Sequence, residues 1–128
     1  MANDMPFAVF ELKEYMVIFR QSEERDFGGV IANIRGLVRC TGIGVSEDDK
    51  NKYQLDVFFL AGNSNFPTPQ IDLEYKAGSL FMPMSDMSTF IDVLRNEKPI
   101  YGHLRGDNPQ LTSITTTNEP IGVGDEDF

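Results

Sequence analysis

Two stretches of the chain alternate basic or aromatic residues with apolar ones, a pattern suited to contact with a polyanion. The first is residues 30–45, VIANIRGLVRCTGIGV, which has the composition of a long β-strand. Arg35, Leu37 and Arg39 project from one face of such a strand, because side chains alternate with period two. Arginine side chains of this kind can follow the phosphates of a nucleic-acid backbone.

The second stretch is residues 99–105, PIYGHLR, in which Tyr101, His103 and Arg105 share one strand face. An aromatic ring stacks a base for ~1–3 kcal/mol whichever base it is. If the two strand faces adjoin, they form a small cationic surface with rings for single-stranded nucleic acid. Two residues of the stretch 53–61 are further stacking candidates. The candidate nucleic-acid contacts are Arg35, Arg39, Tyr53, Phe58, Tyr101, His103 and Arg105.

Residues with catalytic or metal-binding chemistry are sparse. His103 is the single histidine, and a zinc site needs more nitrogen or sulfur ligands than it can supply. Cys40 alternates in phase with Ile34 and Val38 and reads as a small buried hydrophobe. Asp26–Gly29 spells DFGG, but the chain is too short for a protein kinase and lacks the other kinase signatures. We therefore expect no enzyme, no catalytic residue, no metal and no cofactor.

The charge balance qualifies the nucleic-acid interpretation. Twenty acids against eleven bases give a net charge of −9, which normally argues against a polyanionic ligand. Four of those acids lie from Glu119 onward, where there is no base, so the preceding 118 residues carry −5. A body of that charge can still present a local basic face if its acids lie elsewhere.

Alternation and turn residues predict a mainly β chain. Residues 7–20 are predicted as one long strand or two short ones, and residues 30–45 as a second long strand, after a turn over the charged SEERDFGG. The sequence leaves open whether 30–45 is one element or two, because Gly36, Gly42 and Gly44 each suit a bulge or bend. Further strands are predicted at 53–61, 71–84 (one or two short strands), 99–105 and 111–117.

One helix is predicted over residues 86–96. Met87, Phe90, Ile91 and Leu94 form a single apolar stripe, and Ser85 is a suitable N-cap. A helix between the third and fourth main strands is the layout of a five-stranded oligonucleotide/oligosaccharide-binding (OB) barrel. A small α+β rolled sheet with one helix is the alternative. We expect a core domain over 1–118 and a flexible acidic tail over 119–128.

The chain ends in GDEDF, three acids followed by a terminal aromatic ring. Such a segment suits a partner with an apolar pocket rimmed by Lys or Arg. It resembles the C-termini of phage and bacterial single-stranded DNA-binding proteins. That resemblance implies sequence-tolerant DNA binding and recruitment of replication partners through the tail; the matching positions are Asp125, Glu126, Asp127 and Phe128.

The alternative function is a non-catalytic oligomeric or protein-interaction module. Apolar strand positions are plentiful, and an edge strand such as LTSITTT (111–117) could pair with another copy, so we expect a homo-oligomer in either case. A third hypothesis, a small-molecule-binding or enzymatic domain, is supported only by the general observation that the open ends of β-barrels form ligand pockets. No apolar run is long enough to span a membrane, and the start lacks the pattern of a signal peptide. We expect a soluble cytoplasmic protein.

Overall fold

The structure is a computed structural model and describes residues 7–116. Its secondary structure is mainly β, with one α-helix and two short 3₁₀ turns. The seven strands form one sheet in the order β4-β5-β3-β2-β1-β6-β7. The strands are β1 (Phe7–Phe27), β2 (Val30–Gly44), β3 (Lys52–Leu60), β4 (Gln70–Asp72), β5 (Ala77–Pro83), β6 (Tyr101–Arg105) and β7 (Ser113–Thr115).

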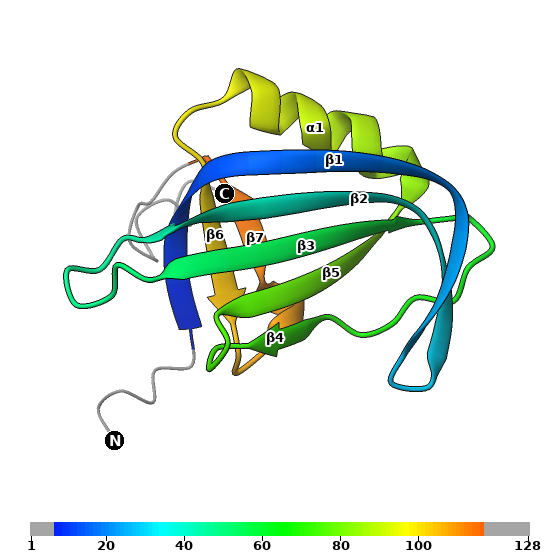
Figure 1. Cartoon of the computed structure of the whole chain (residues 1–128), viewed down its shortest axis with the longest axis horizontal. Helices are drawn as coiled ribbons and strands as arrows, with labels where there is room; N and C mark the ends of the chain where they lie inside the picture. Colours follow the sequence, from blue (N-terminus) through cyan, green and yellow to red (C-terminus); the bar gives the residue numbers. More distant parts are fainter. Residues whose placement is uncertain (1–6, 117–128) are drawn as a thin grey trace.

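The longest strand, β1, binds the two halves of the sheet together. Its first five residues pair with β6, and from Phe10 onward it pairs with β2. The register with β2 shifts between Leu12 and Glu14 and again between Phe19 and Glu23. Such bulges bend a strand, and Figure 1 shows β1 turning sharply at both ends of its long straight part. The sheet is therefore strongly curved.

The β1–β2 connection differs from the prediction. Residues 22–29 were predicted as a charged turn, but β1 continues to Phe27 and only Gly28 and Gly29 form the turn. Both glycines have positive φ, 64° and 100°, as a two-residue hairpin turn requires. The charged residues pair instead with the first part of β2, which forms one continuous strand over residues 30–44.

The sheet is open, so the prediction of a closed five-stranded barrel is wrong and the rolled α+β alternative fits. The free edge of β3 pairs in parallel with β5, and β4 pairs with the far edge of β5. The last strand, β7, has three residues and pairs with β6 alone. In the predicted strand 111–117, Leu111 belongs to a 3₁₀ turn, Pro109–Leu111. Within residues 7–116, no strand pairing therefore joins β7 to β4 at the other edge of the sheet.

The helix α1 (Met87–Asn96) is where the apolar stripe predicted it, and it covers the inner face of the sheet (Figure 1). Met87 and Leu94 are buried in the main core, and Phe90 packs on Phe59 with ring centroids 5.6 Å apart. Ser85 is not the N-cap: it lies in the 3₁₀ turn Met84–Asp86 that leads into the helix.

Two apolar clusters lie on opposite faces of β2 and β3. The inner cluster, under α1, contains alternate residues of both strands, among them Val38, Cys40 and Val57. The outer cluster contains Leu37 and Phe58. Strand alternation therefore divides the sheet into an inner face, which α1 covers, and an outer face, which the bent end of β1 partly covers.

Candidate nucleic-acid interface

The outer face of β2 and β3 carries Arg39, one of the predicted phosphate contacts. Arg39 lies directly opposite Asp56, and its guanidinium binds both carboxylate oxygens at 2.9 and 3.0 Å. The side chain of Arg39 is 40% exposed whereas that of Asp56 is 11% exposed. The hydrogen bond and the charge of Asp56 raise the pKa of Arg39, so the cation is held in place at the surface.

Next to this pair, a second arginine lies on an aromatic cluster. The guanidinium carbon of Arg25 is 5.3 Å from the centre of the Phe58 ring and 5.8 Å from that of Phe27. Phe58 stacks on Phe81 with centroids 5.6 Å apart, and Phe27 meets both rings edge-on. Phe58 and Asp56 are two residues apart on β3, about 7 Å of strand, so Arg25 and Arg39 contact successive positions on the same face of that strand.

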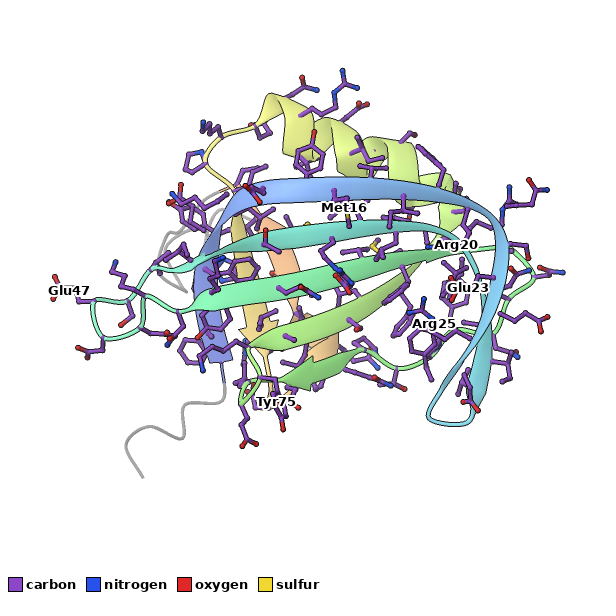
Figure 2. The ribbon with its side chains drawn as sticks, viewed as in Figure 1. Met16, Arg20, Glu23, Arg25, Glu47 and Tyr75 are labelled. Atoms are coloured by element: carbon purple, nitrogen blue, oxygen red, sulfur yellow. The ribbon has the colours of Figure 1, made fainter. Side chains whose placement is uncertain are left out.

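Two more arginines join this group through the bend of β1. Arg20 and Arg25 both bind Glu23, at 3.1 and 2.7 Å, and Arg35 donates to the Arg20 carbonyl oxygen at 3.4 Å. Figure 2 shows Arg20, Glu23 and Arg25 together on the concave side of the bend, toward β2 and β3. We call Arg20, Arg25, Arg35 and Arg39 the outer arginine cluster. Ion pairs set three of these cations, Arg20, Arg25 and Arg39, against the carboxylates of Glu23 and Asp56.

Arg35 belongs to this cluster for a different reason from the predicted one. The β2–β3 register shifts between Ile34 and Gly36, and Arg35 is the extra residue of that bulge. Simple alternation with Leu37 and Arg39 therefore fails at this position. Arg35 reaches the cluster because the bend of β1 brings the carbonyl of Arg20 to it.

The two stacking candidates on β3 are both inaccessible, so these predictions are wrong. Tyr53 is 5% exposed on the inner face, where its ring stacks on Phe10 and its hydroxyl donates to Asp49. Phe58 is 3% exposed, because Phe27 and Arg25 cover it. Neither ring can stack a base without a rearrangement.

The predicted residues of β6 do not adjoin the arginines, because β1 separates β6 from β2. Tyr101 pairs with Glu11 and Arg105 with Phe7, whereas Arg39 pairs with Met16. The nine residues from Phe7 to Met16 correspond to roughly 30 Å of strand. The seven candidates therefore do not form one cluster.

The β6 side chains nevertheless have defined environments. Arg105 binds both carboxylate oxygens of Asp107 at 3.0 and 2.8 Å, which raises the pKa of Arg105. The Nε2 atom of His103 is 2.9 Å from the hydroxyl oxygen of Thr115 on β7. Tyr101, nearer to β2, lies beside a hollow in the outer face.

This hollow, of about 310 Å³, lies between the start of β1 and the β2–β3 connection. Its lining includes Lys13, Lys50 and Tyr101 as well as Glu11, whose carboxylate pairs with Lys13 at 3.2 Å. Ile43, which also lines it, is four residues from Arg39 on β2, or about 13 Å of strand. Lys52 lies opposite Ile43 on β3. The outer face thus has arginines at one end and lysines with a tyrosine at the other.

Sequence reasoning missed Arg20, Arg25 and Phe27 as members of the site. Arg25 and Phe27 lie in the segment that was assigned to a turn. The signal was the continued period of two, since Glu23, Arg25 and Phe27 share one face if the strand runs on. The bend that turns this face toward Phe58 has no comparable signal, because it depends on contacts between distant segments.

Other chemistry finds little support in the part of the chain described. Within residues 7–116 no group of three or more His, Cys, Asp and Glu side chains could hold a metal ion. Cys40 is fully buried, and burial raises the pKa of its thiol to about 12. In the same range, no helix has the length and apolar character needed to cross a bilayer. The tail residues Asp125, Glu126, Asp127 and Phe128 and the predicted 118/119 boundary lie outside the described residues.

Comparison with known proteins adds no relative: no family model, no curated protein and no solved structure matches this chain.

Proposed function

We propose that this protein binds single-stranded DNA with little sequence preference along the outer face of β1, β2 and β3. The observation that carries the proposal is the placement of Arg25 and Arg39 on that face, one over an aromatic cluster and the other 40% exposed beside it. Proteins that bind single strands combine a cationic groove with aromatic rings and Arg–ring contacts. The lysine hollow with Tyr101 would continue the path.

The ion pairs on this face are compatible with the proposal. Arg39 and Arg25 each contact a carboxylate, and a phosphate group can bind the remaining donors of a guanidinium or replace the carboxylate. The Arg25–Glu23 pair is partly exposed on both sides, and such pairs have a median worth of about 0–1 kcal/mol, so a phosphate can replace that carboxylate at little cost. Arg39 keeps its bonds to the nearly buried Asp56 and offers a phosphate its remaining donors. The carboxylates hold the arginines in position while no ligand is bound.

The curvature of the sheet also favours this face. In OB barrels, the face of the second and third strands binds the oligonucleotide, together with the loops that flank it. Here β2 and β3 carry Arg39 on the corresponding outer face, and the bent β1–β2 hairpin flanks it with Arg25. The comparison concerns the binding face alone, because the sheet of this protein is open and forms no OB barrel.

The acidic end of the chain has two roles in this proposal. Asp125, Glu126 and Asp127 would compete with DNA for the outer face, and Phe128 would enter an apolar pocket of a replication-type partner. Removal of residues 119–128 should then strengthen DNA binding. The competition follows from the charge of the tail, and the partner role follows from the resemblance of the tail to those of single-stranded DNA-binding proteins.

Fluorescence-anisotropy titration of labelled oligo-dT tests the proposal, with the full chain and with a chain that ends at Asn118. We expect binding that weakens steeply as salt rises, and tighter binding by the shortened chain. Arg25→Gln should weaken binding and lower the salt slope by about one. Arg95→Gln is the matched control, because Arg95 lies on α1. Absence of binding at low salt by both chains would overturn the proposal.

The alternative, a non-catalytic assembly module, is favoured by the large exposed side chains Tyr15, Met16 and Phe19 of β1, which are 38%, 46% and 69% exposed. Exposed apolar groups of this size often belong to protein contacts when they lie close together. A defined oligomer in scattering measurements, combined with no affinity for oligo-dT, would select this function instead.

A further inference from the structure

The middle of β1 has an open edge. From Glu14 to Phe19 it pairs in regular register with β2 on one side. On the other side, pairing with β6 ends at Glu11, and the Leu12 amide then donates to the Ile100 carbonyl oxygen at 2.8 Å. Among residues 7–116, no strand pairs with this side of β1 beyond that point. An open edge offers backbone donors and acceptors to another strand.

This edge also exposes apolar side chains on both faces of the sheet. Tyr15, Met16 and Phe19 are 38%, 46% and 69% exposed, and Figure 2 shows Met16 on the straight part of β1. Tyr15 and Phe19 lie on the inner face, because they pair with Cys40 and Gly36. Their exposure shows that α1, which covers that face, leaves the edge of β1 uncovered.

Symmetry restricts how two copies could pair along this edge. A two-fold axis perpendicular to the sheet keeps each side chain on the same face of the sheet. Since side chains alternate between faces along a strand, two opposed residues must both have odd numbers or both have even numbers. The straight part of β1 therefore allows a self-pair centred on Met16, on Val17 or on Ile18. Each centre defines a different set of opposed side chains.

Only the register centred on Val17 pairs side chains of complementary chemistry. It places Glu14 opposite Arg20 and Tyr15 opposite Phe19, each twice because of the symmetry. Opposite charges and aromatic pairs are the cross-strand combinations that stabilise sheets. The other two centres place charged residues opposite apolar ones.

The neighbouring registers show this contrast in particular residues. Centred on Met16, the pair would place Glu14 opposite Ile18. Centred on Ile18, it would place Arg20 opposite Met16. Both arrangements bring a charge against an apolar side chain without an opposite charge as partner.

We propose that two copies of this protein associate through antiparallel pairing of the β1 edges, with Val17 opposite Val17. The two sheets then become one continuous sheet across the interface. Glu14 and Arg20 form the outermost opposed pairs, because the register shifts at Leu12/Glu14 and Phe19/Glu23 bend the strand away beyond them and limit the paired segment. The acidic β2–β3 connection lies at the far end of the sheet, where Figure 2 places Glu47, so its charges stay away from the interface.

Sedimentation equilibrium of the full chain without DNA tests the association independently of the proposed function. We expect a concentration-dependent mass that rises from 14.4 kDa to twice that value. Glu14→Arg should raise the dissociation constant by on the order of tenfold or more, because it creates two like-charge pairs with Arg20. A mass of 14.4 kDa at every concentration would overturn the proposal.

A charge swap tests the register itself. The double variant Glu14→Arg/Arg20→Glu should recover dimerisation relative to Glu14→Arg alone, because the opposite charges meet again. Arg20→Glu also loses the contact with Glu23, so circular dichroism melting of each variant must show a folded protein. Glu24→Arg is the matched control, since it makes the same charge change on β1 outside the paired segment. A dimer that Glu14→Arg leaves intact, or that the swap fails to recover in a folded protein, would overturn the register.

Discussion

Arg39 on β2 and Asp56 on β3 face each other across the sheet, and two parallel hydrogen bonds join the guanidinium to the carboxylate. The pair lies at the boundary between the apolar outer cluster and the polar part of the outer face. Gln54 also approaches Asp56, with its amide nitrogen 3.4 Å from the carboxylate. Asp56 thus depends on Arg39 for the neutralisation of a nearly buried charge.

Loss of the Arg39 side chain should therefore destabilise the fold. We expect Arg39→Gln to lower the free energy of unfolding by about 1–3 kcal/mol, because Asp56 loses its ionic partner in a site with little solvent. Urea denaturation measures this change. Arg105→Gln is the control, since Asp107 is far more exposed than Asp56 and the loss of its partner should change the stability much less. Equal effects of the two substitutions would contradict the argument.

Gly42 should not tolerate a side chain. A Cβ atom there would overlap the carbonyl of Glu11 on β1, which is backbone and cannot turn aside. We expect Gly42→Ala to lower the free energy of unfolding by about 1–3 kcal/mol or more, because β1 and β2 must separate locally to make room for the Cβ atom. Gly62→Ala provides the control, as a Cβ at that position has no neighbour within 4 Å. Thermal melting of the two variants should differ clearly; similar melting temperatures would disprove the close approach.

Cys40 should make the fold sensitive to alkaline pH. Burial raises the pKa of its thiol from 9.0 to about 12, so the folded state favours the neutral thiol more than the unfolded state does. This contribution is fully present below pH 9 and is lost as the pH rises toward 12. Cys40→Val lacks it, and the wild-type protein should lose stability relative to this variant over that interval. Parallel stability curves above pH 9 would contradict the prediction.

The same burial predicts low reactivity of the thiol. At pH 8 the folded protein should react with a thiol reagent far more slowly than the unfolded protein, because the thiolate is the nucleophile and the site is closed. Absorbance with Ellman's reagent, with and without denaturant, measures the difference. Rapid reaction of the folded protein would show that the inner face opens easily around Cys40.

The hydrogen bond between Tyr53 and Asp49 should stabilise the fold in a way that depends on pH in the acid range. Burial acts to raise the pKa of Asp49, but hydrogen bonds from Tyr53 and Asn51 outweigh it and lower that pKa below 3.8. The contribution is therefore present above pH 3.8 and disappears as the pH falls through the lowered value. We expect Tyr53→Phe to cost about 1.5–3 kcal/mol at neutral pH. Urea denaturation should show that this cost becomes smaller in acid; a cost independent of pH would refute the linkage.

The sequence by itself determined the elements with strong local periodicity. Alternation identified β3 and most of β2, and the stripe from Met87 to Leu94 identified α1. Alternation also placed Arg39 on a face opposite to Cys40. These features follow from neighbours along the chain, because strand and helix geometry convert spacing directly into faces.

The tertiary structure alone decided which of these faces meet. The parallel pairing of β3 with β5, the bend of β1 and the bulge at Arg35 all depend on contacts between segments far apart in sequence. They kept the sheet open, separated Arg105 from Arg39 and brought Arg25 onto Phe58 instead. The spacing of residue types along the chain does not predict these contacts, because they form, and stabilise the fold, only once strands far apart in sequence lie side by side.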